Sequence, residues 1–290
     1  MTGGSLFCFG LGFSARRLAQ SLAAEGWRVT GTCRTDEKKA ELEHAGVEAH
    51  VFDGTVKPNP ALVEDATHVL SSVPPGDAGD PVLTRCTKLL RDCKKLTWLG
   101  YLSTTGVYGD TGGEWVDENS PVRAGVTRSQ RRAEAEEGWL ALYRDHNLPV
   151  HLFRLAGIYG PGRSLLDAIR LGRAKRIDKV GHLFSRIHVD DIASVLRASM
   201  AKPNPGAIYN VCDDEPAAPA DVTAYGCGLL GVEPPNLIPF AEAAKSMTPM
   251  GLSFWKDNRR VRNDRIKREL GVTLTYPSYR EGLKALAGGE

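Results

Sequence analysis

Two alternating patterns of hydrophobic positions run along the first half of this chain. Short apolar runs, such as residues 5–10 and 27–33, are typical of strands that are buried on both faces. Longer amphipathic runs lie between them, such as residues 15–27, where Leu18 and Leu22 share one helical face. Strands that alternate with helices pair in parallel through right-handed crossovers. The pattern therefore predicts an α/β fold built on a doubly wound parallel sheet.

The same patterns give the expected elements. We expect strands at residues 5–10, 27–33, 47–52, 66–73, 96–103 and 149–155. We expect helices at residues 15–27, 36–46, 81–93 and 129–147. Gly138 is expected to interrupt the last of these helices. Beyond about Gly157 the rhythm weakens and Pro and Gly cluster, which predicts a smaller C-terminal lobe over residues 158–290, with residues near 186–212 returning to the sheet.

Composition excludes several classes of protein. The 290 residues are 42% hydrophobic and 25% charged with a formal net charge of +2, so nothing global favours nucleic acid or a membrane surface as a partner. No apolar run approaches the roughly 18 residues of a membrane span, and the N-terminus lacks the basic start of a signal peptide. Six cysteines without a CxxC pair predict free buried thiols in a reducing, cytoplasmic setting. Seven histidines without HExxH spacing predict no metal site.

A glycine-rich stretch follows the first expected strand. Gly10, Gly12 and Ala15 have the G-x-G-x-x-A spacing and stand where that strand passes into the first helix. The first glycine permits a tight turn, the second lets the backbone approach a pyrophosphate at the helix N-terminus, and the alanine allows close helix–strand packing. The stretch therefore predicts dinucleotide binding by residues 1–157, with a ligand-free glycine turn as the alternative.

The end of the second expected strand bears on which dinucleotide is bound. An Asp or Glu at that place would accept a hydrogen bond from the ribose 2′-hydroxyl of NAD. Here Cys33 is followed by Arg34, so no carboxylate repels a 2′-phosphate, and the guanidinium can pair with one. We therefore expect NADP rather than NAD, with a solvated surface arginine as the alternative for Arg34.

Several stretches together resemble the extended short-chain dehydrogenase/reductase family, the NAD(P)-dependent epimerase/dehydratase group. They are "GLGFSA", "LSTTGVYGDTGGEWVDENSP", "FRLAGIYGPGR", "RIHVDDIASVLRASM" with "IYNVCDDEP", and "RIKRELGVTLTYPSYREGL". Their order and spacing agree with the family over nearly the whole chain. The resemblance implies a Rossmann-type sheet that binds NAD(P), with a small molecule bound between the sheet and the smaller lobe.

The resemblance also implies roles for individual residues. Those expected to hold the cofactor are Gly10, Gly12, Phe13, Ser14 and Ala15 at the pyrophosphate, Arg34 at the 2′-phosphate, Asp53 at the adenine, Ser71, Ser72 and Val73 beside it, and Ala156, Gly157 and Ile158 at the nicotinamide. Thr104 stands where the family places its catalytic Ser or Thr. Residues expected to face the substrate cleft are Tyr108, Tyr159, Arg163, Arg186 and His188, although packing or a surface position suits each equally well.

One motif of the family is missing. Its catalysis depends on Tyr-x-x-x-Lys at the start of the long helix, where the two side chains share one face and the tyrosine passes a proton. Aligning "RSQRRAEAE" by its Ala-Glu-Ala-Glu end places Arg128 at the tyrosine position and Arg132 at the lysine position. Arg132 can replace the lysine as a cation, but Arg128 cannot exchange protons near neutral pH. The proton donor is then Tyr108, His188, water or the substrate.

Two functions follow from this departure. The first is an NAD(P)-binding oxidoreductase or epimerase-like enzyme with non-standard acid–base chemistry, acting on a small anionic carbonyl or hydroxyl compound such as a nucleotide-sugar. The second is a catalytically silent NADP(H)-binding sensor of the same fold. The long helix beyond Ser129 offers apolar side chains for a homodimer, but its many charges also suit a monomer.

Overall fold

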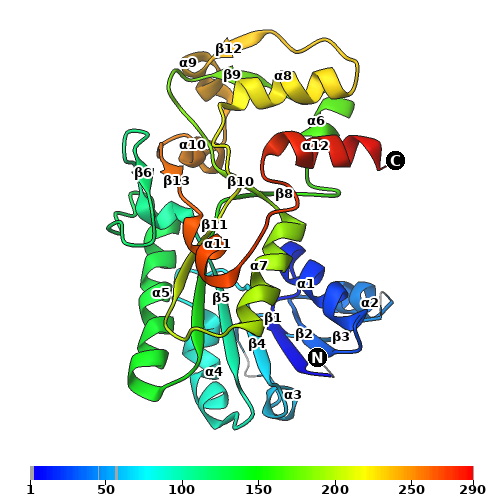
Figure 1. The fold of residues 1–290 in the computed structure, drawn as a ribbon, viewed down its shortest axis with the longest axis vertical. Coiled ribbons are helices and arrows are strands. Elements are labelled where there is room, and N and C mark those ends of the chain that lie inside the picture. Colours follow the sequence, from blue (N-terminus) through cyan, green and yellow to red (C-terminus); the bar gives the residue numbers. More distant parts are fainter. Residues whose placement is uncertain (1–2, 45, 56–57, 290) are drawn as a thin grey trace.

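A parallel sheet of seven strands forms the centre of the molecule (Figure 1). The computed structural model describes residues 3–44, 46–55 and 58–289. The strand order is β11-β7-β5-β4-β1-β2-β3, so the order reverses between β1 and β4. The strands are β1 (Ser5–Phe9), β2 (Arg28–Cys33), β3 (Glu48–Val51), β4 (His68–Ser71), β5 (Trp98–Thr104), β7 (Val150–Leu155) and β11 (Ile208–Val211). This order confirms the predicted doubly wound Rossmann-type sheet.

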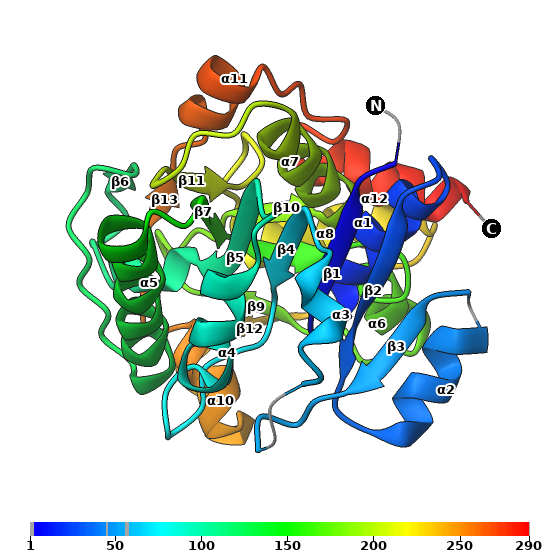
Figure 2. The same cartoon turned by 90° about the horizontal axis from the view of Figure 1, so that it is seen from below.

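Each face of the sheet has its own hydrophobic core. Along β1, Leu6 and Cys8 belong to one core while Phe7 and Phe9 belong to the other, because successive side chains point to opposite faces. The first core is covered by α1 (Phe13–Ala23), α2 (Asp36–His44), α7 (Val189–Ala201) and α11 (Asp264–Leu270). The second is covered by α3 (Ala61–Glu64), α4 (Pro81–Asp92) and α5 (Thr127–His146), and Figure 2 shows the two helical layers. All six cysteines are buried.

Helix α5 corrects one expectation. It runs without interruption through Gly138, although this glycine was expected to break it. A Cβ atom added at Gly138 would lie 2.7 Å from Cδ1 of Leu83 in α4, so the glycine permits the close contact of the two helices. In the second expected helix, Ala45 lies outside the described residues.

The smaller lobe lies beyond the carboxyl ends of the strands, at the top of Figure 1. Its helices α6 (Leu165–Arg170), α8 (Pro219–Leu229) and α12 (Tyr279–Gly288) share a third hydrophobic core. Its other elements are β9 (Arg176–Asp178), which pairs with β12 (Leu237–Pro239), then α9 (Phe240–Ala243) and α10 (Pro249–Phe254). The short strands β8 (Gly157–Tyr159) and β10 (Arg186–His188) pair at the junction. The expected return to the sheet covered only residues near 186–212. Helix α11 also packs on the sheet, in the same core as α7 and β11.

Two further short strands join distant segments. Strand β6 (Trp115–Val116) pairs in parallel with β13 (Arg260–Val261), which connects the loop after β5 to the end of the small lobe. Among the described helices, none is long and apolar enough to cross a membrane.

A buried histidine at the start of β7, His151, predicts that the stability of the fold falls at acid pH. Nε2 of His151 accepts a hydrogen bond of 2.8 Å from the backbone N–H of Asn204, so the imidazole is neutral, and burial lowers its pKa from 6.5 to about 4. The unfolded chain therefore takes up this proton first as the pH falls. The stabilisation, up to about 3 kcal/mol, is present above pH 6.5 and is lost as the pH falls toward 4.

The measurement is the free energy of unfolding in urea at pH 7 and at pH 4.5. We expect His151→Gln to lose roughly 2 kcal/mol less than the wild type between these two values, because glutamine does not titrate. The exposed His44, changed to glutamine, is the control and should lose as much as the wild type. Equal losses in all three proteins would contradict this interpretation of His151.

Candidate functional site

The glycine loop after β1 is fixed against the end of β2. The backbone N–H of Gly10 donates to Oγ1 of Thr32 at 2.9 Å, and the N–H of Leu11 donates to the Thr32 carbonyl at 2.7 Å. Gly10 has φ of +85°, and a Cβ atom there would lie 3.0 Å from Oγ of Ser72. A glycine is therefore required at this position both by backbone conformation and by space. Oγ of Ser72 in turn donates to the Gly10 carbonyl, which ties the loop to the end of β4.

The N-terminus of α1 has the properties of an anion site. Gly12 is the N-cap residue and supplies no side-chain hydrogen bond to the first turn, which begins with Phe13, Ser14 and Ala15. A Cβ atom on Gly12 would meet only Oγ of Ser72, at 4.0 Å. The backbone is thus open to a close ligand at the positive end of a helix dipole. This opening lies where the strand order reverses, so the residues present fit a dinucleotide pyrophosphate.

The neighbouring strand ends carry the other residues expected at the cofactor. Arg34 directly follows β2 and is exposed. Asp53 follows β3, and its carboxylate accepts from the N–H and the hydroxyl of Thr55, which lowers its pKa. Ser71 is fully buried at the end of β4, and its hydroxyl finds no hydrogen-bond partner among the described residues. Val73 follows Ser72 and approaches Gly10.

A cavity of about 630 Å³ lies between the sheet and the smaller lobe. This volume is in the range of small-molecule sites. Eight residues expected from the sequence line it: Thr104, Arg128, Ala156, Gly157, Ile158, Tyr159, Arg163 and Arg186. These residues lie in or directly beside five elements, β5, α5, β7, β8 and β10, whose ends meet at the cavity.

Thr104 and Arg128 line this cavity together. Thr104 is the last residue of β5, and its Oγ1 accepts from the backbone N–H of Gly106 at 3.1 Å, so its own proton is free to be donated. Arg128 is in the first turn of α5 and is exposed, with its guanidinium carbon 4.3 Å from the centre of the Phe254 ring. Burial and the charge of Arg132 lower the pKa of Arg128, while the charge of Asp257 opposes them.

Arg132 takes a different direction from Arg128. Its guanidinium donates to the carbonyl of Leu102 in β5 and lies 5.6 Å from the centre of the Tyr101 ring. It is not among the residues that line the cavity. Arg132 therefore braces α5 against β5, and the structure supports a packing role for it.

Two expected proton donors do not reach the cavity. Tyr108 is fully buried, donates to Oδ1 of Asn210 at 2.7 Å and accepts from Arg154 at 2.9 Å, and burial raises its pKa to about 12. His188 is also buried, and its Nδ1 accepts from the N–H of Asp190 at 3.2 Å. Burial lowers the pKa of His188, and neither residue lines the cavity. The expectation that they face the substrate is corrected, because Asn210 and Arg154 hold Tyr108 inward and His188 caps the N-terminus of α7.

The remaining expected substrate residues differ in how they are held. Arg186 donates to the carbonyls of Phe184 and Ala217, and burial lowers its pKa. Tyr159 is buried, with its hydroxyl 3.5 Å from the Ser278 carbonyl, and burial raises its pKa. Arg163 is exposed. Its guanidinium lies 5.5 Å from the ring centre of Phe13, the first residue of α1, so its charge lies toward the N-terminus of that helix.

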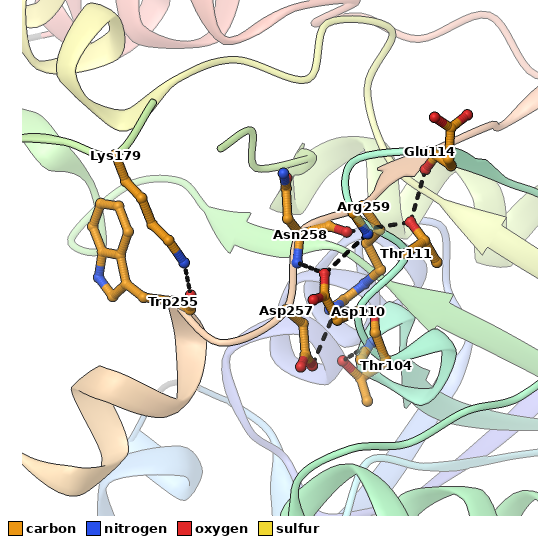
Figure 3. Close-up of polar contacts among 12 residues, drawn as sticks. Thr104, Asp110, Thr111, Glu114, Lys179, Trp255, Asp257, Asn258 and Arg259 are labelled. Atoms are coloured by element: carbon orange, nitrogen blue, oxygen red, sulfur yellow. Dashed lines mark hydrogen bonds and ion pairs between the residues drawn. The ribbon is translucent and has the colours of Figure 1, made fainter. Parts of the chain in front are cut away.

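The sequence patterns missed one segment of the cavity wall. Phe254, the last residue of α10, lines the cavity together with Trp255, Asp257 and Arg259. Those last three residues lie between α10 and β13 (Figure 3). Arg259 donates to the carbonyl of Gly109 at 3.0 Å and to Asp257 at 3.3 Å. The only signal was the concentration of aromatic and charged residues in "SFWKDNRR", without helical or strand periodicity.

Comparisons with known proteins show which proteins this chain is related to. No protein-family model matches the sequence. The chain is 31% identical over 288 residues to Protein YeeZ of Escherichia coli (strain K12), an alignment that covers 92% of this chain and 94% of that protein. The chain belongs to the family of that protein. The solved structure of a functionally unknown conserved protein from Silicibacter pomeroyi DSS is 47% identical, covers 99% of both chains and has a TM-score of 0.90.

More distant proteins share the fold. The dTDP-glucose 4,6-dehydratase of Bacillus anthracis str. Ames, solved in complex with NAD, is 18% identical with coverage of 99% and 96% and a TM-score of 0.78. The human epimerase family protein SDR39U1, solved with NADPH, is 18% identical with coverage of 98% of both chains and a TM-score of 0.73. A 3-diazoavenalumate denitrifying reductase of Streptomyces sp is 29% identical over 175 residues, 58% of this chain and 55% of that protein. The chain has the fold of NAD-dependent epimerases and dehydratases, as its motifs predicted.

A buried ion pair anchors the helix that carries Arg128. Glu136 of α5 and Arg154 of β7 are 4% and 3% exposed, and Arg154 donates to the carboxylate at 2.7 Å and 3.0 Å. Ser103 of β5 donates to the same carboxylate at 2.5 Å, and Arg154 continues to Tyr108. The middle of α5 is thus tied to two strands beside the cavity, which fixes the position of the helix that carries Arg128.

The described part of the chain contains no group of three or more His, Cys, Asp or Glu side chains placed to hold a metal ion.

Proposed function

We propose that this protein is an NAD(P)-binding oxidoreductase or epimerase-like enzyme that acts on a small anionic carbonyl or hydroxyl compound. The observation that carries the proposal is the joint position of the open N-terminus of α1 and the cavity, both at the carboxyl edge of the sheet. A dinucleotide whose pyrophosphate binds at the N-terminus of α1 would extend along the carboxyl edge of the sheet, toward the cavity. Structural neighbours that hold NAD or NADPH, and a relative named as a reductase, support the same class.

NADP is the proposed cofactor. The backbone at Gly10, Gly12 and the first turn of α1 would hold the pyrophosphate, and Arg34 would pair with the 2′-phosphate. Ala156, Gly157 and Ile158 would line the nicotinamide end. When bound, this cofactor supplies or accepts a hydride.

The protein's own residues have separate tasks at the substrate. Thr104 donates its hydroxyl hydrogen bond to the reacting oxygen, because Gly106 already occupies one of its lone pairs. Arg128 supplies positive charge at the mouth and stays protonated, since a guanidinium does not titrate near neutral pH. Reduction of a carbonyl consumes one hydride and one proton, and water that enters through the open mouth supplies the proton.

A silent NADP(H)-binding protein is the second candidate. The observation that favours it is the arginine at the position where the sequence motifs call for tyrosine, together with the inward turn of Tyr108 and His188. Such a protein would bind NADPH and consume none of the candidate substrates.

Thr104→Val tests the enzymatic proposal. We expect NADPH consumption with the best compound from a panel of aldehydes, ketones and nucleotide-sugars to fall by about 100-fold or more, because one aligned donor to the reacting oxygen is lost. Thr104→Ser keeps the hydroxyl and should retain most of the rate. NADPH affinity, measured by fluorescence titration, should change in neither variant.

Two results would decide against the enzyme. Consumption that is the same in Thr104→Val as in the wild type would remove Thr104 from the reaction. NADPH binding without consumption of any compound would favour the silent NADP(H)-binding protein.

A further inference from the structure

The mouth of the cavity has an aromatic wall. Phe254 is 52% exposed there, beside Trp255. The Trp255 ring stacks on His182 at 5.4 Å and meets Phe184 edge-on at 5.3 Å. Phe240 packs against it at 5.2 Å, so the indole is braced by three other rings. The wall therefore presents flat apolar surface in a fixed place, which favours a flat apolar ligand.

The segment behind this wall is clamped at Asn258 (Figure 3). The N–H of Asn258 donates to Asp110 at 2.9 Å, and its carbonyl accepts from Thr111 and Gly113 at 3.0 Å each. Its side-chain amide donates to the carbonyl of Gly181 and accepts from the N–H of Leu183. One residue thus joins the loop after β5 to the loop after β9, and it holds the wall in place before any ligand binds.

The arginines of the cavity differ in their partners. Arg186 is hydrogen-bonded to two carbonyls, and Arg259 is paired with Asp257. Arg163 lies over Phe13 at the cofactor end. Within residues 3–44, 46–55 and 58–289, Arg128 has neither a hydrogen bond nor an ion pair, and its guanidinium lies over the ring of Phe254.

We propose that Arg128 binds the carboxylate of a small planar acid whose flat apolar body packs against Phe254 and Trp255. The guanidinium fork matches a carboxylate, and its stacking on Phe254 orients the fork along the wall. The ion pair between Arg259 and Asp257 leaves Arg128 as the cation beside the wall that a ligand can neutralise. This inference rests on the proposed function, because it names the substrate class for the same cavity.

The space also favours a small acid over a nucleotide-sugar. The cavity of about 630 Å³ includes Ala156, Gly157 and Ile158, the residues proposed for the nicotinamide end, so the substrate shares this volume. The remaining lining is mixed, and its apolar side chains include Leu155, Val222 and Leu283. These apolar side chains and the aromatic wall can contact a hydrocarbon framework.

The test compares trans-cinnamate with its uncharged amide, cinnamamide, by isothermal titration with and without saturating NADP. We expect the wild type to bind cinnamate about tenfold or more tightly than cinnamamide, as a hydrogen-bonded charge pair predicts. Arg128→Met keeps the stem over Phe254 and should remove this preference. Arg131→Met, which changes the neighbouring arginine that pairs with Asp77 on the surface, should preserve it.

Each outcome bears on one claim. Equal affinities for acid and amide, or an unchanged preference in Arg128→Met, would overturn the inference. UDP-glucose that displaces cinnamate and binds more tightly would overturn it as well. If NADP does not bind but cinnamate binds with the predicted dependence on Arg128, the proposed function fails while this inference stands.

Discussion

Replacing Glu136 with alanine is expected to lower the free energy of unfolding by about 3–5 kcal/mol. The carboxylate is 4% exposed and accepts three hydrogen bonds of 2.7–3.2 Å from Arg154 and one from Ser103. Its removal leaves the Arg154 charge buried without a counterion, in an interior where an unpaired charge is costly. The effect is large because one carboxylate serves α5, β5 and β7 together.

The neighbouring Glu137 provides a matched control. It lies on the same helix, and its side chain is 68% exposed in a surface pair with Arg144. Glu137→Ala should change the free energy of unfolding by less than about 0.5 kcal/mol. Urea unfolding followed by circular dichroism measures both variants. If the two variants lose similar stability, the buried pair does not anchor α5 as described.

Gly12→Val is expected to weaken NADPH binding by about a hundredfold or more while leaving the fold intact. Its Cβ would meet only Oγ of Ser72 at 4.0 Å, and φ of −79° suits any residue, so neither the backbone nor the space at Cβ opposes a larger residue. The isopropyl group would instead occupy the space where the pyrophosphate must approach the N-terminus of α1. Fluorescence titration gives the affinity, and thermal unfolding checks the fold.

Gly228→Val is the control for this substitution. Gly228 is in α8 of the smaller lobe, and a Cβ atom there meets no other atom within 4 Å. We expect this variant to bind NADPH as the wild type does. If Gly12→Val binds NADPH with unchanged affinity, the cofactor does not lie on the glycine loop.

The sheet and the glycine loop were predictable because their signals are local. The alternation of Leu6 and Cys8 with Phe7 and Phe9 fixes a strand buried on both faces, and the spacing of Gly10 and Gly12 fixes the turn. Each signal lies within a few residues. Gly138 misled the prediction because its reason, the contact with α4, is invisible in the local pattern.

The cavity was predictable only in part, because side-chain direction depends on distant partners. Tyr108 turns inward to Asn210, a residue 102 positions away in the chain. Asp257 and Arg259 reach the site because β13 pairs with β6 and because Asn258 is bound by two other loops. No periodicity within that segment announces those contacts.

The measurement that tests the central claim most directly is isothermal titration of the wild-type protein with NADPH and with NADH. Binding at the open N-terminus of α1 predicts a micromolar Kd for NADPH, and the pairing of Arg34 with the 2′-phosphate predicts about tenfold or more weaker binding of NADH. Saturating NADPH should also raise the midpoint of thermal unfolding. If neither dinucleotide binds or shifts that midpoint at millimolar concentration, the account of the site is contradicted.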